Sequence, residues 1–546
     1  MRAPDAPLPT YASYVGGRDI DAAEHIYAVS TRAILRDAPG ALRLKRMLER
    51  GLIDPASAGP EVIGRCALAG PDTVRAALSA AAGAVREWSS SPLEVRLRLG
   101  ELIRKRLAET RPAFVDIMVA EGRTRTLAEW EIDGLTHIFS PETLSWCAEL
   151  LQRDFSYGGK SISMRRKADG VVCVAPPQNA PHSNCIYGAA ALLSGNTVVV
   201  RAPRSIPFGV MYALREIIAP ALEEVGAPPG TLNVVCGPPM MEDWLGSEHV
   251  DDIIYFGGVE KGMAFQRDCV AAGKKPILEL AGNDCAVVWR DADLDLAAGA
   301  LVEAFHASGQ ICNIPNQVIA HPAIADELIE RLKAAAARIR PGYPEEEGVV
   351  LTPVLAADGY FAFLQDALRK GARLVCGGRR LEVDGTPSDT GFFIEPTVVR
   401  VDGLAGAREV EAVRGETFFP LLPVVVPEPG VSDERLLDEV LRFIDGNAYG
   451  LRNSLWTADE RVAGRFVTEV RNGGVLKVND DSHCGFYPYM PSHGGTGLTS
   501  GVFGEASYMM IRTTHLQGIA MTPPRVSRGS GDGTAPAGPA GSERGA

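Results

Sequence analysis

Three polar residues of this 546-residue chain stand in sequence settings that suit covalent chemistry. Cys312 lies in a loop-like segment, SGQICN, where nearby hydrogen-bond donors can hold a thiolate, the nucleophilic form of cysteine. Glu279 ends the apolar run PILE, where a carboxylate is costly unless it has a partner or a chemical role. Asn179 follows two prolines in the turn APPQNAP. Each residue also has an ordinary alternative: a small buried thiol, a solvated strand residue and a turn residue.

A pair of glycines could admit a phosphate group. Gly257 and Gly258 follow an apolar run in YFGGVEKG, and glycines at a strand end let a phosphate approach the backbone N–H groups of the next helix. No predicted strand is followed by the dinucleotide fingerprint G-x-G-x-x-G. Taken alone, the two glycines are therefore better interpreted as a turn without a ligand.

From residue 170 onward, short β-branched runs alternate with Ala-rich helical segments. The first runs are VVCVAPP, TVVVRAP, TLNVVCG, DIIYFGG, PILELAG and CAVVWR. A second section after Cys312 has the runs NQVIAHP, ARLVCGG, FFIEPTVVR and LLPVVVP, with a helix predicted over Ile324–Ile339. Strands that alternate with helices indicate doubly wound parallel sheets, so we expect an α/β chain with two lobes in series.

The flanking segments predict smaller elements. Residues 1–65 contain short helical pieces punctuated by Pro and Gly and are interpreted as an N-terminal extension. Apolar residues at helical spacing predict surface helices over Pro71–Ala82 and Leu93–Arg111. The alternating segment 155–166 contains Gly-Gly and predicts a hairpin. Residues 523–546 are rich in Gly, Pro and Ser and are predicted to be disordered.

Composition and charge argue against several classes of partner. The formal charge is −13 and the sequence pI is about 5.3, which without a basic block argues against nucleic acid or an anionic membrane surface. The sequence has no apolar run of about 18 residues for a membrane span, and its start lacks an apolar signal segment. The ten cysteines include no C-x-x-C pair and no zinc-ligand spacing. We therefore expect a reduced, cytoplasmic protein without a metal.

Together, the segments around Asn179, Glu279 and Cys312 resemble those of the aldehyde dehydrogenase superfamily. ELAG at Glu279 is similar to the family's E-L-G-G, GQIC at Cys312 to its G-Q-x-C, and the turn at Asn179 to its P-W-N-F-P. GETFFP, which contains Glu416 and Phe418, and YFGGVEKG are similar to the family's nicotinamide and pyrophosphate segments. The spacing agrees as well, with 100 residues from Asn179 to Glu279 and 33 from Glu279 to Cys312.

The resemblance covers about residues 70–516 and implies the family's fold. That fold has a dinucleotide-binding lobe, a catalytic lobe and a small β element for oligomerisation. The implied ranges are 66–282 for the first lobe, interrupted by the hairpin at about 155–168, then 283–495 for the catalytic lobe and 496–522 for the oligomerisation segment. The β element would combine the hairpin with a strand over Ser507–Thr514. In the family a neighbouring subunit covers such edges, so a homodimer or homotetramer is expected.

The resemblance also implies a role for each motif residue. The Cys312 thiolate would attack the aldehyde carbon, while the Asn179 side chain and the Cys312 N–H would stabilise the oxygen that becomes negative. Hydride transfer to the nicotinamide would give a thioester, and Glu279 would activate the water that hydrolyses it. The residues implied for the cofactor are Glu416 and Phe418 at the nicotinamide ribose and ring, and Gly257 and Gly258 at the pyrophosphate.

Two arginines bear on the choice of cofactor. Arg201 stands at the position of a family lysine that binds the cofactor, and it keeps the charge. Arg204 stands where NAD-preferring members place a glutamate for the adenine ribose hydroxyls. An arginine cannot accept those hydrogen bonds but can pair with a 2′-phosphate. The resemblance therefore favours NADP over NAD, unless Arg204 simply points into solvent.

The segments implied to surround the substrate differ from those of the common aliphatic enzymes. Ala180 and His493 replace aromatic residues of the family, and Tyr187 and Phe486 are the aromatic groups expected at the pocket. This combination predicts a wider and more polar pocket, suited to an aromatic or functionalised aldehyde. A packed core histidine is the alternative interpretation of His493.

The expected function is NAD(P)+-dependent oxidation of an aldehyde to the carboxylic acid, through a thiohemiacetal and a thioester on Cys312. The nearest rival is NADPH-dependent reduction of an activated acyl group to the aldehyde. Acyl-transferring relatives commonly lack the general-base glutamate, so Glu279 favours hydrolysis. A rival of another class is an inactive structural paralogue, against which the presence of Cys312, Glu279 and Asn179 argues.

Overall fold

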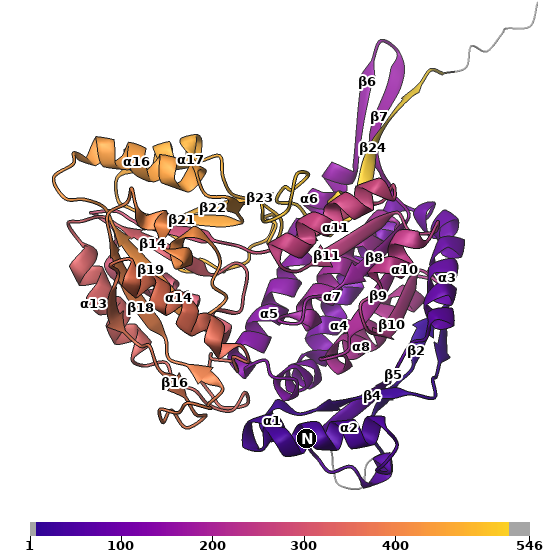
Figure 1. The fold of residues 1–546 in the computed structure, drawn as a ribbon. Helices are drawn as coiled ribbons and strands as arrows, with labels where there is room; N and C mark the ends of the chain where they lie inside the picture. The colour runs from indigo at the N-terminus through magenta and orange to yellow at the C-terminus, as the bar shows by residue number, and fades with distance from the viewer. Residues whose placement is uncertain (1–6, 524–546) are drawn as a thin grey trace, which may run out of the picture.

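The computed structural model describes residues 7–523, so the tail predicted to be disordered lies outside the described residues except for residue 523. Within residues 7–523, two lobes are built around separate seven-stranded sheets, and a thin three-stranded arm projects from the first lobe (Figure 1). The prediction of two doubly wound α/β lobes is confirmed.

The first sheet consists mainly of parallel strands that are buried along most of their length. They lie in the order β12 (Lys275–Glu279), β11 (Asp252–Phe256), β8 (Val171–Ala175), β9 (Thr197–Pro203) and β10 (Leu232–Gly237). Helices such as α3 and α7 pack on the sheet, and strands enclosed in this way read as continuous apolar runs. β2 (Ser13–Val15) pairs antiparallel with β10 and is followed by β3 (Arg18–Ile20) at the edge.

The second sheet has one antiparallel edge strand beside parallel neighbours. The order is β15 (Arg373–Cys376), β18 (Thr397–Asp402), β19 (Leu421–Val426), β14 (Pro315–Ala320), β13 (Asp284–Val288), β21 (Arg452–Trp456) and β22 (Val475–Val478). β15 pairs antiparallel with β18, and the other pairs are parallel. The helix predicted over Ile324–Ile339 is observed as α13 (Ala325–Ala336).

The first 65 residues, interpreted from sequence as an extension, fold against the first lobe. Their further elements are β1 (Thr10–Tyr11), β4 (His25–Val29), α1 (Thr31–Arg36), α2 (Ala38–Glu49), η1 (Pro55–Ser57) and the start of β5 (Val62–Ala67). β1, β5 and β4 form a small sheet, and the Asp37 side chain caps α2 by accepting a hydrogen bond from Gly40 N. With β2 and β3 in the first sheet, this segment is part of the folded body.

Helices cover the sheets of both lobes. The two helices predicted near the N-terminus are longer than expected, as α3 (Pro71–Ser89) and α4 (Leu93–Ala120), because the buried face of α4 continues through Phe114 and Met118. The other helices are α5 (Arg125–Ile138), α6 (Pro141–Leu151), α7 (Pro181–Ala189), η2 (Ala190–Ser194), α8 (Phe208–Tyr212), η3 (Ala213–Ile218), α9 (Ala219–Glu224), α10 (Met241–Gly246), α11 (Val259–Ala271), α12 (Leu294–Leu301), η4 (Val302–Gly309), α14 (Ala357–Arg369), η5 (Ala407–Glu409), α15 (Glu411–Arg414), α16 (Asp433–Asp445) and α17 (Glu460–Glu469). Among residues 7–523, no helix has the length and apolar character needed to cross a membrane.

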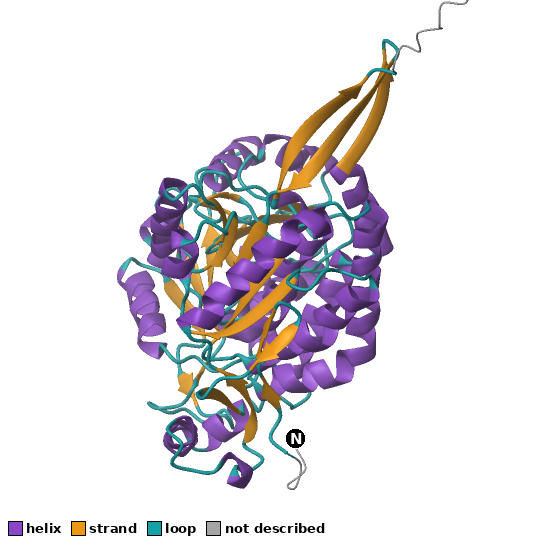
Figure 2. Cartoon of the chain, turned by 90° about the vertical axis from the view of Figure 1, so that its right-hand side faces the viewer, coloured by secondary structure: helices purple, strands orange, loops and turns teal. Residues whose placement is uncertain are grey.

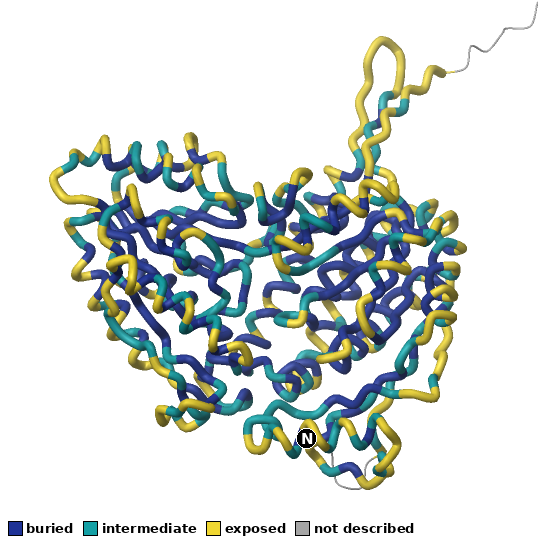
Figure 3. The backbone as a smooth tube through the Cα atoms, viewed as in Figure 1, coloured by how far each residue is buried: buried dark blue, intermediate teal, exposed yellow. Residues whose placement is uncertain are grey.

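The arm contains the predicted hairpin, observed as β6 (Gln152–Tyr157) and β7 (Lys160–Ala168), and a third strand, β24 (Thr514–Met521). It extends well beyond the body and is largely exposed (Figures 2 and 3). The prediction of a strand over Ser507–Thr514 is wrong, because this segment contains a helical turn, α18 (Met509–Arg512). Residues 508–511 are all buried, and such a run lacks the alternation of a half-exposed strand.

Two short two-stranded sheets complete the described strands. β16 (Arg380–Leu381) pairs with β17 (Phe393–Ile394), and β20 (Tyr449–Gly450) pairs with β23 (Thr496–Gly497).

Candidate active site

The predicted site residues of the first lobe gather at the carboxyl ends of its parallel strands. Asn179 follows β8, Arg201 lies near the end of β9, Gly257 follows β11, and Glu279 ends β12. Ligands of open α/β sheets bind outside these strand ends. Cys312 comes from the second lobe, on the loop between η4 and β14. This loop contacts Asn179 at the strand ends of the first lobe.

The backbone before Cys312 takes an unusual path. Ala307, Ser308 and Gly309 have positive φ values of 49°, 54° and 77°. A Cβ atom at Gly309 would collide with the backbone carbonyl of Phe419, so only glycine fits there. This close approach explains the glycine of the GQIC segment.

Asn179 contacts the Cys312 loop directly. Its Nδ2 donates a hydrogen bond of 3.0 Å to the carbonyl of Gln310, and its own carbonyl accepts one of 3.4 Å from Arg123 Nη1. Arg123 is in turn paired with the buried Glu131. The amide nitrogen carries a second hydrogen that can be offered to a ligand oxygen. The structure thus brings Asn179 and the cysteine loop together.

Burial favours the protonated form of the Cys312 thiol. All ten cysteines are free, and Cys312 is one of the two that are not fully buried. Desolvation by the surrounding protein raises the pKa of Cys312 to about 12, and the carboxyl groups of Glu416, Asp284 and Glu279 add to the shift. The carboxyl groups nearby do not favour a thiolate at Cys312, so a thiolate held by nearby donors stays a prediction.

Glu279 lies beneath the protein surface with both carboxylate oxygens bound. Gly494 N donates to Oε2 at 2.9 Å, and the Arg512 guanidinium donates to Oε1. Burial raises the pKa of Glu279, while Arg512 and the Gly494 N–H oppose that shift. Three residues further on, a Cβ atom at Gly282 would collide with the Cys312 carbonyl, which places the ELAG segment against the cysteine loop.

Glu416 joins the same cluster. Its Oε1 accepts a hydrogen bond of 3.0 Å from Gly282 N, and burial raises its pKa to about 8. Phe418 follows with a φ of 60°, a conformation rare outside glycine. The GETFFP segment is thus adjacent to the segment that links Glu279 to the cysteine loop.

The two predicted phosphate-binding glycines stand at the N-terminus of α11. Gly258 is the N-cap residue, and no side chain caps the free N–H groups of the first turn. A Cβ atom at Gly257 would lie 2.6 Å from the Tyr255 hydroxyl, whereas at Gly258 it would meet nothing within 4 Å. Such a helix start is a general anion site.

The two cofactor arginines differ in environment. Arg201 is buried and donates from Nη1 to the Gly237 carbonyl at 3.3 Å, and its Nε has no partner within residues 7–523. The Arg204 side chain is 55% exposed, and its Nη2 lies 3.4 Å from Oε2 of Glu49 on α2. Arg204 therefore does not simply point into solvent, since a carboxylate from the N-terminal segment faces it.

Aromatic packing fixes the residues predicted for the substrate pocket. Tyr187 is buried, donates to the Ser507 carbonyl at 3.1 Å and stacks on the His493 ring at a centroid distance of 4.1 Å. Burial lowers the pKa of His493 to about 3, so its imidazole is neutral. Phe486 packs on Trp130 at 4.9 Å. His493 is thus a packed histidine.

Ala180 is the N-cap residue of α7 and directly follows Asn179. Its methyl side chain makes no cap hydrogen bond to the helix.

Comparison with known proteins identifies the family. The aldehyde dehydrogenase family model matches residues 49–514, most of the chain. The chain belongs to the aldehyde dehydrogenase family. The α-ketoglutarate semialdehyde dehydrogenase of Haloferax volcanii is 31% identical over 455 residues, covering 81% of this chain and 90% of that protein. The betaine aldehyde dehydrogenase of Bacillus subtilis is 29% identical, covering 77% of this chain and 82% of that protein.

Solved aldehyde dehydrogenase structures share the fold. An NAD-dependent aldehyde dehydrogenase from Sinorhizobium meliloti aligns with a TM-score of 0.77 at 23% identity, covering 94% of this chain and 95% of the other. Lactaldehyde dehydrogenase from Escherichia coli aligns with a TM-score of 0.73 at 22% identity, covering 95% and 100%. The predictions of the family, of its fold and of an oxidoreductase are confirmed.

Sequence reasoning about this aldehyde dehydrogenase missed two charged residues of the site. Arg512 is the one charged residue in SYMMIRTT, and that position in an apolar segment could have drawn attention to it. Glu49 carries no such signal, because it ends an ordinary charged helix.

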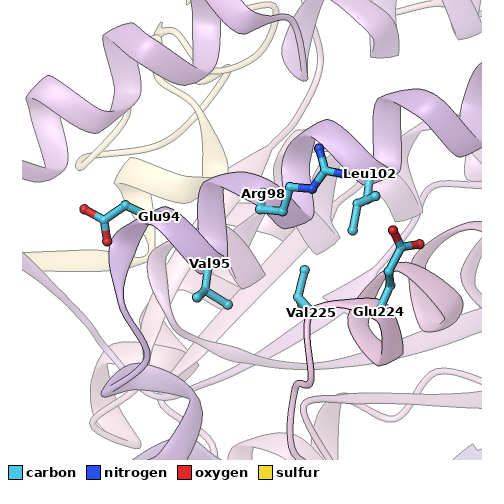
Figure 4. Close-up of a pocket in the computed structure, with 6 residues that line it drawn as sticks. All are labelled: Glu94, Val95, Arg98, Leu102, Glu224 and Val225. Atoms are coloured by element: carbon cyan, nitrogen blue, oxygen red, sulfur yellow. The ribbon is translucent and has the colours of Figure 1, made fainter.

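A further pocket lies apart from these residues. A pocket of about 310 Å³ between α4 and the end of α9 shares no residue with the aldehyde dehydrogenase site (Figure 4). Its lining residues are Glu94, Val95, Arg98, Leu102, Glu224 and Val225. In the described part of the chain, no group of three His, Cys, Asp or Glu side chains is placed to hold a metal ion.

Proposed function

We propose that this aldehyde dehydrogenase oxidises its aldehyde to the carboxylic acid through a thioester on Cys312, which is hydrolysed with Glu279 as the base. The observation that carries the proposal is the meeting of three segments at one place. Asn179 Nδ2 binds the carbonyl of Gln310, two residues before Cys312, and Gly282, three residues after Glu279, packs on the Cys312 carbonyl. A nucleophile, an oxyanion donor and a base are the groups that acyl chemistry needs.

The residues act in sequence. Once deprotonated, Cys312 Sγ adds to the aldehyde carbon, and the oxygen that gains negative charge is stabilised by Asn179 Nδ2 and the Cys312 N–H. After oxidation to the thioester, water adds to the acyl carbon and gives its proton to the Glu279 carboxylate. The carbon–sulfur bond then breaks, and the acid leaves.

The redox partner is NAD or NADP. Solved relatives are described as NAD-dependent or as complexed with NADP, and this chain offers fitting groups. The N–H groups at the start of α11 lack a side-chain cap, and the buried Arg201 Nε lacks a partner among the described residues. When bound, the cofactor supplies the hydride acceptor. The residues that would hold it are Arg201, Gly257, Gly258, Glu416 and Phe418.

Within this pair we propose NADP as the preferred cofactor. Arg204 supplies an exposed guanidinium near Arg201, and a 2′-phosphate would pair with it. Glu49 faces Arg204 and would compete with that phosphate. The preference therefore depends on how far the phosphate displaces Glu49 from Arg204.

For the substrate we propose an aldehyde with a polar functional group. Similar proteins are described as acting on α-ketoglutarate semialdehyde, betaine aldehyde and lactaldehyde, all of which are functionalised. Trp130 of α5 packs on Phe486, and an aromatic aldehyde could also pack against these rings. A panel of aldehydes that tests the substrate should therefore contain both functionalised and aromatic aldehydes.

We further propose that the arm formed by β6, β7 and β24 mediates a homodimer or homotetramer. Its apolar side chains Phe155, Tyr157 and Leu516 are 50%, 79% and 55% exposed, which favours coverage by another subunit. Mass measurement by light scattering distinguishes these assemblies from a monomer.

The decisive test mixes the purified protein with NADP+ or NAD+ and a panel of aldehydes and follows the absorbance of the reduced cofactor. Oxidation of an aldehyde by the wild type, lost in Cys312→Ala, supports the proposal. Consumption of NADPH with an activated acyl group, without aldehyde oxidation, would replace it by acyl reduction. Turnover in neither direction would indicate an inactive paralogue.

A further inference from the structure

Arg512 and Glu279 form an ion pair that is almost excluded from water. Arg512 Nη1 donates to Glu279 Oε1, and each side chain is 6% exposed. The second carboxylate oxygen, Oε2, is fixed by Gly494 N at 2.9 Å. Within residues 7–523, Glu279 is the only carboxylate that Arg512 contacts. The two residues are 233 positions apart, so the tertiary fold creates this pair.

The other ionisable groups around Glu279 cannot replace Arg512. His493 and Tyr187 are neutral at pH 7, because burial lowers the pKa of the imidazole to about 3 and raises that of the phenol. Cys312 is either neutral or negative. Arg452, the nearby cation of the second lobe, donates to backbone carbonyls, those of His483, Gly485 and Ser492. Arg512 is thus the cation that directly compensates the buried carboxylate.

A buried carboxylate that loses its partner takes up a proton, since an isolated charge is costly in a medium of low dielectric constant. A protonated Glu279 could not accept a proton from water. The orientation of the carboxylate would also change, because one of its two fixed oxygens would be released.

We propose that Arg512 is a positioning residue for Glu279, which keeps the buried carboxylate charged and oriented for water activation. The inference rests on the proposed function, in which water adds to the thioester, its proton passes to Glu279 and the Cys312 sulfur departs. Arg512 exchanges no proton in that step. Arg512 ends α18, and β24 of the arm begins at Thr514, so a short stretch of chain links Arg512 to the arm. The ion pair in turn joins Glu279 to Arg512.

The expected effect is confined to hydrolysis. In Arg512→Met the pH at which Glu279 ionises should rise by about one to two units, the size of a charge-assisted hydrogen bond to a buried group. The hydrolysis rate increases with pH as Glu279 ionises, so its rising limb should move to higher pH. At pH values below the rising limb, the hydrolysis rate of Arg512→Met should be about ten- to a hundredfold lower than that of the wild type. Arg512→Lys keeps the charge and should restore most of the rate.

The experiment uses 4-nitrophenyl acetate, which acylates a thiol without cofactor or aldehyde. The initial burst of nitrophenolate reports acylation of Cys312, and the steady state reports hydrolysis, both measured from pH 5 to 10. Arg166→Met is the matched control, because Arg166 contacts Thr514 Oγ1 at the base of the arm without touching Glu279. The control should retain the wild-type pH profile.

A second measurement does not depend on activity. The infrared carbonyl band of protonated Glu279, identified by its loss in Glu279→Gln, is titrated in the wild type and in Arg512→Met. A band that persists to higher pH in Arg512→Met supports the ion pair, and an unchanged titration overturns the inference. If the band shifts but hydrolysis does not change, the inferred role in water activation fails together with Glu279 as the base. Faster hydrolysis in Arg512→Met would show that the arginine restrains Glu279 and would also overturn it.

Discussion

Replacing Arg204 by methionine should lower kcat/KM for NADP+ and leave that for NAD+ nearly unchanged. The substitution removes the cation proposed to bind the 2′-phosphate. In the structure Arg204 Nη2 lies 3.4 Å from Glu49 Oε2, and the two side chains are 55% and 15% exposed. A 2′-phosphate must therefore compete with Glu49 for the guanidinium.

Two opposing contributions determine the size of the effect. A charge-assisted contact with the phosphate contributes about 1.5–3 kcal/mol. Loss of an ion pair as exposed as Arg204–Glu49 costs about 0.2–1 kcal/mol. The difference is about 0.5–3 kcal/mol, or roughly two- to a hundredfold in affinity. Glu49→Gln removes the competitor and should raise the NADP+ preference by about 1.4- to fivefold.

The assay determines kcat/KM for both cofactors at one ionic strength, in the wild type and in each variant. Arg98→Met serves as the control, because Arg98 is a similarly exposed arginine paired with Glu101. Added salt should reduce the NADP+ value more steeply than the NAD+ value. A wild-type preference for NAD+ would refute the reasoning, and an NADP+ preference that survives Arg204→Met would locate its cause elsewhere.

The remaining predictions concern Cys312 and Glu279. Cys312→Ala should abolish turnover while cofactor binding, followed by fluorescence titration, persists; a near-normal rate would exclude Cys312 as the nucleophile. Glu279→Gln should give one burst of reduced cofactor followed by slow turnover in rapid-mixing kinetics, because hydrolysis alone needs the carboxylate; an equal loss of burst and steady state would contradict this. Alkylation of Cys312 by iodoacetamide should be slow at pH 7 and rise about tenfold per pH unit, because its pKa is about 12. A rate that levels off near pH 7 would show a thiolate in the resting site.

The parallel sheets could be predicted from the sequence because their strands are enclosed and therefore apolar throughout. The motif glycines were informative for a related reason: at Gly282 and Gly309 a side chain would collide with a backbone carbonyl. Arg512 and Glu49 could not be found in this way. Their partners are 233 and 155 residues away, and local sequence patterns contain no record of such pairs. The strand predicted over Ser507–Thr514 failed because a consecutive apolar run is equally compatible with a buried helical turn.

The charges of the site also bear on the order of its steps. Cys312 and Glu279 lie close enough that the carboxylate raises the pKa of the thiol, so by reciprocity a thiolate must raise the pKa of Glu279. Two negative charges in one buried site are therefore disfavoured. Formation of a thioester removes the charge from the sulfur, and the Glu279 carboxylate, compensated by Arg512, then ionises without that repulsion. On this reasoning, acylation of Cys312 itself favours the carboxylate form of Glu279 at the step that needs a base.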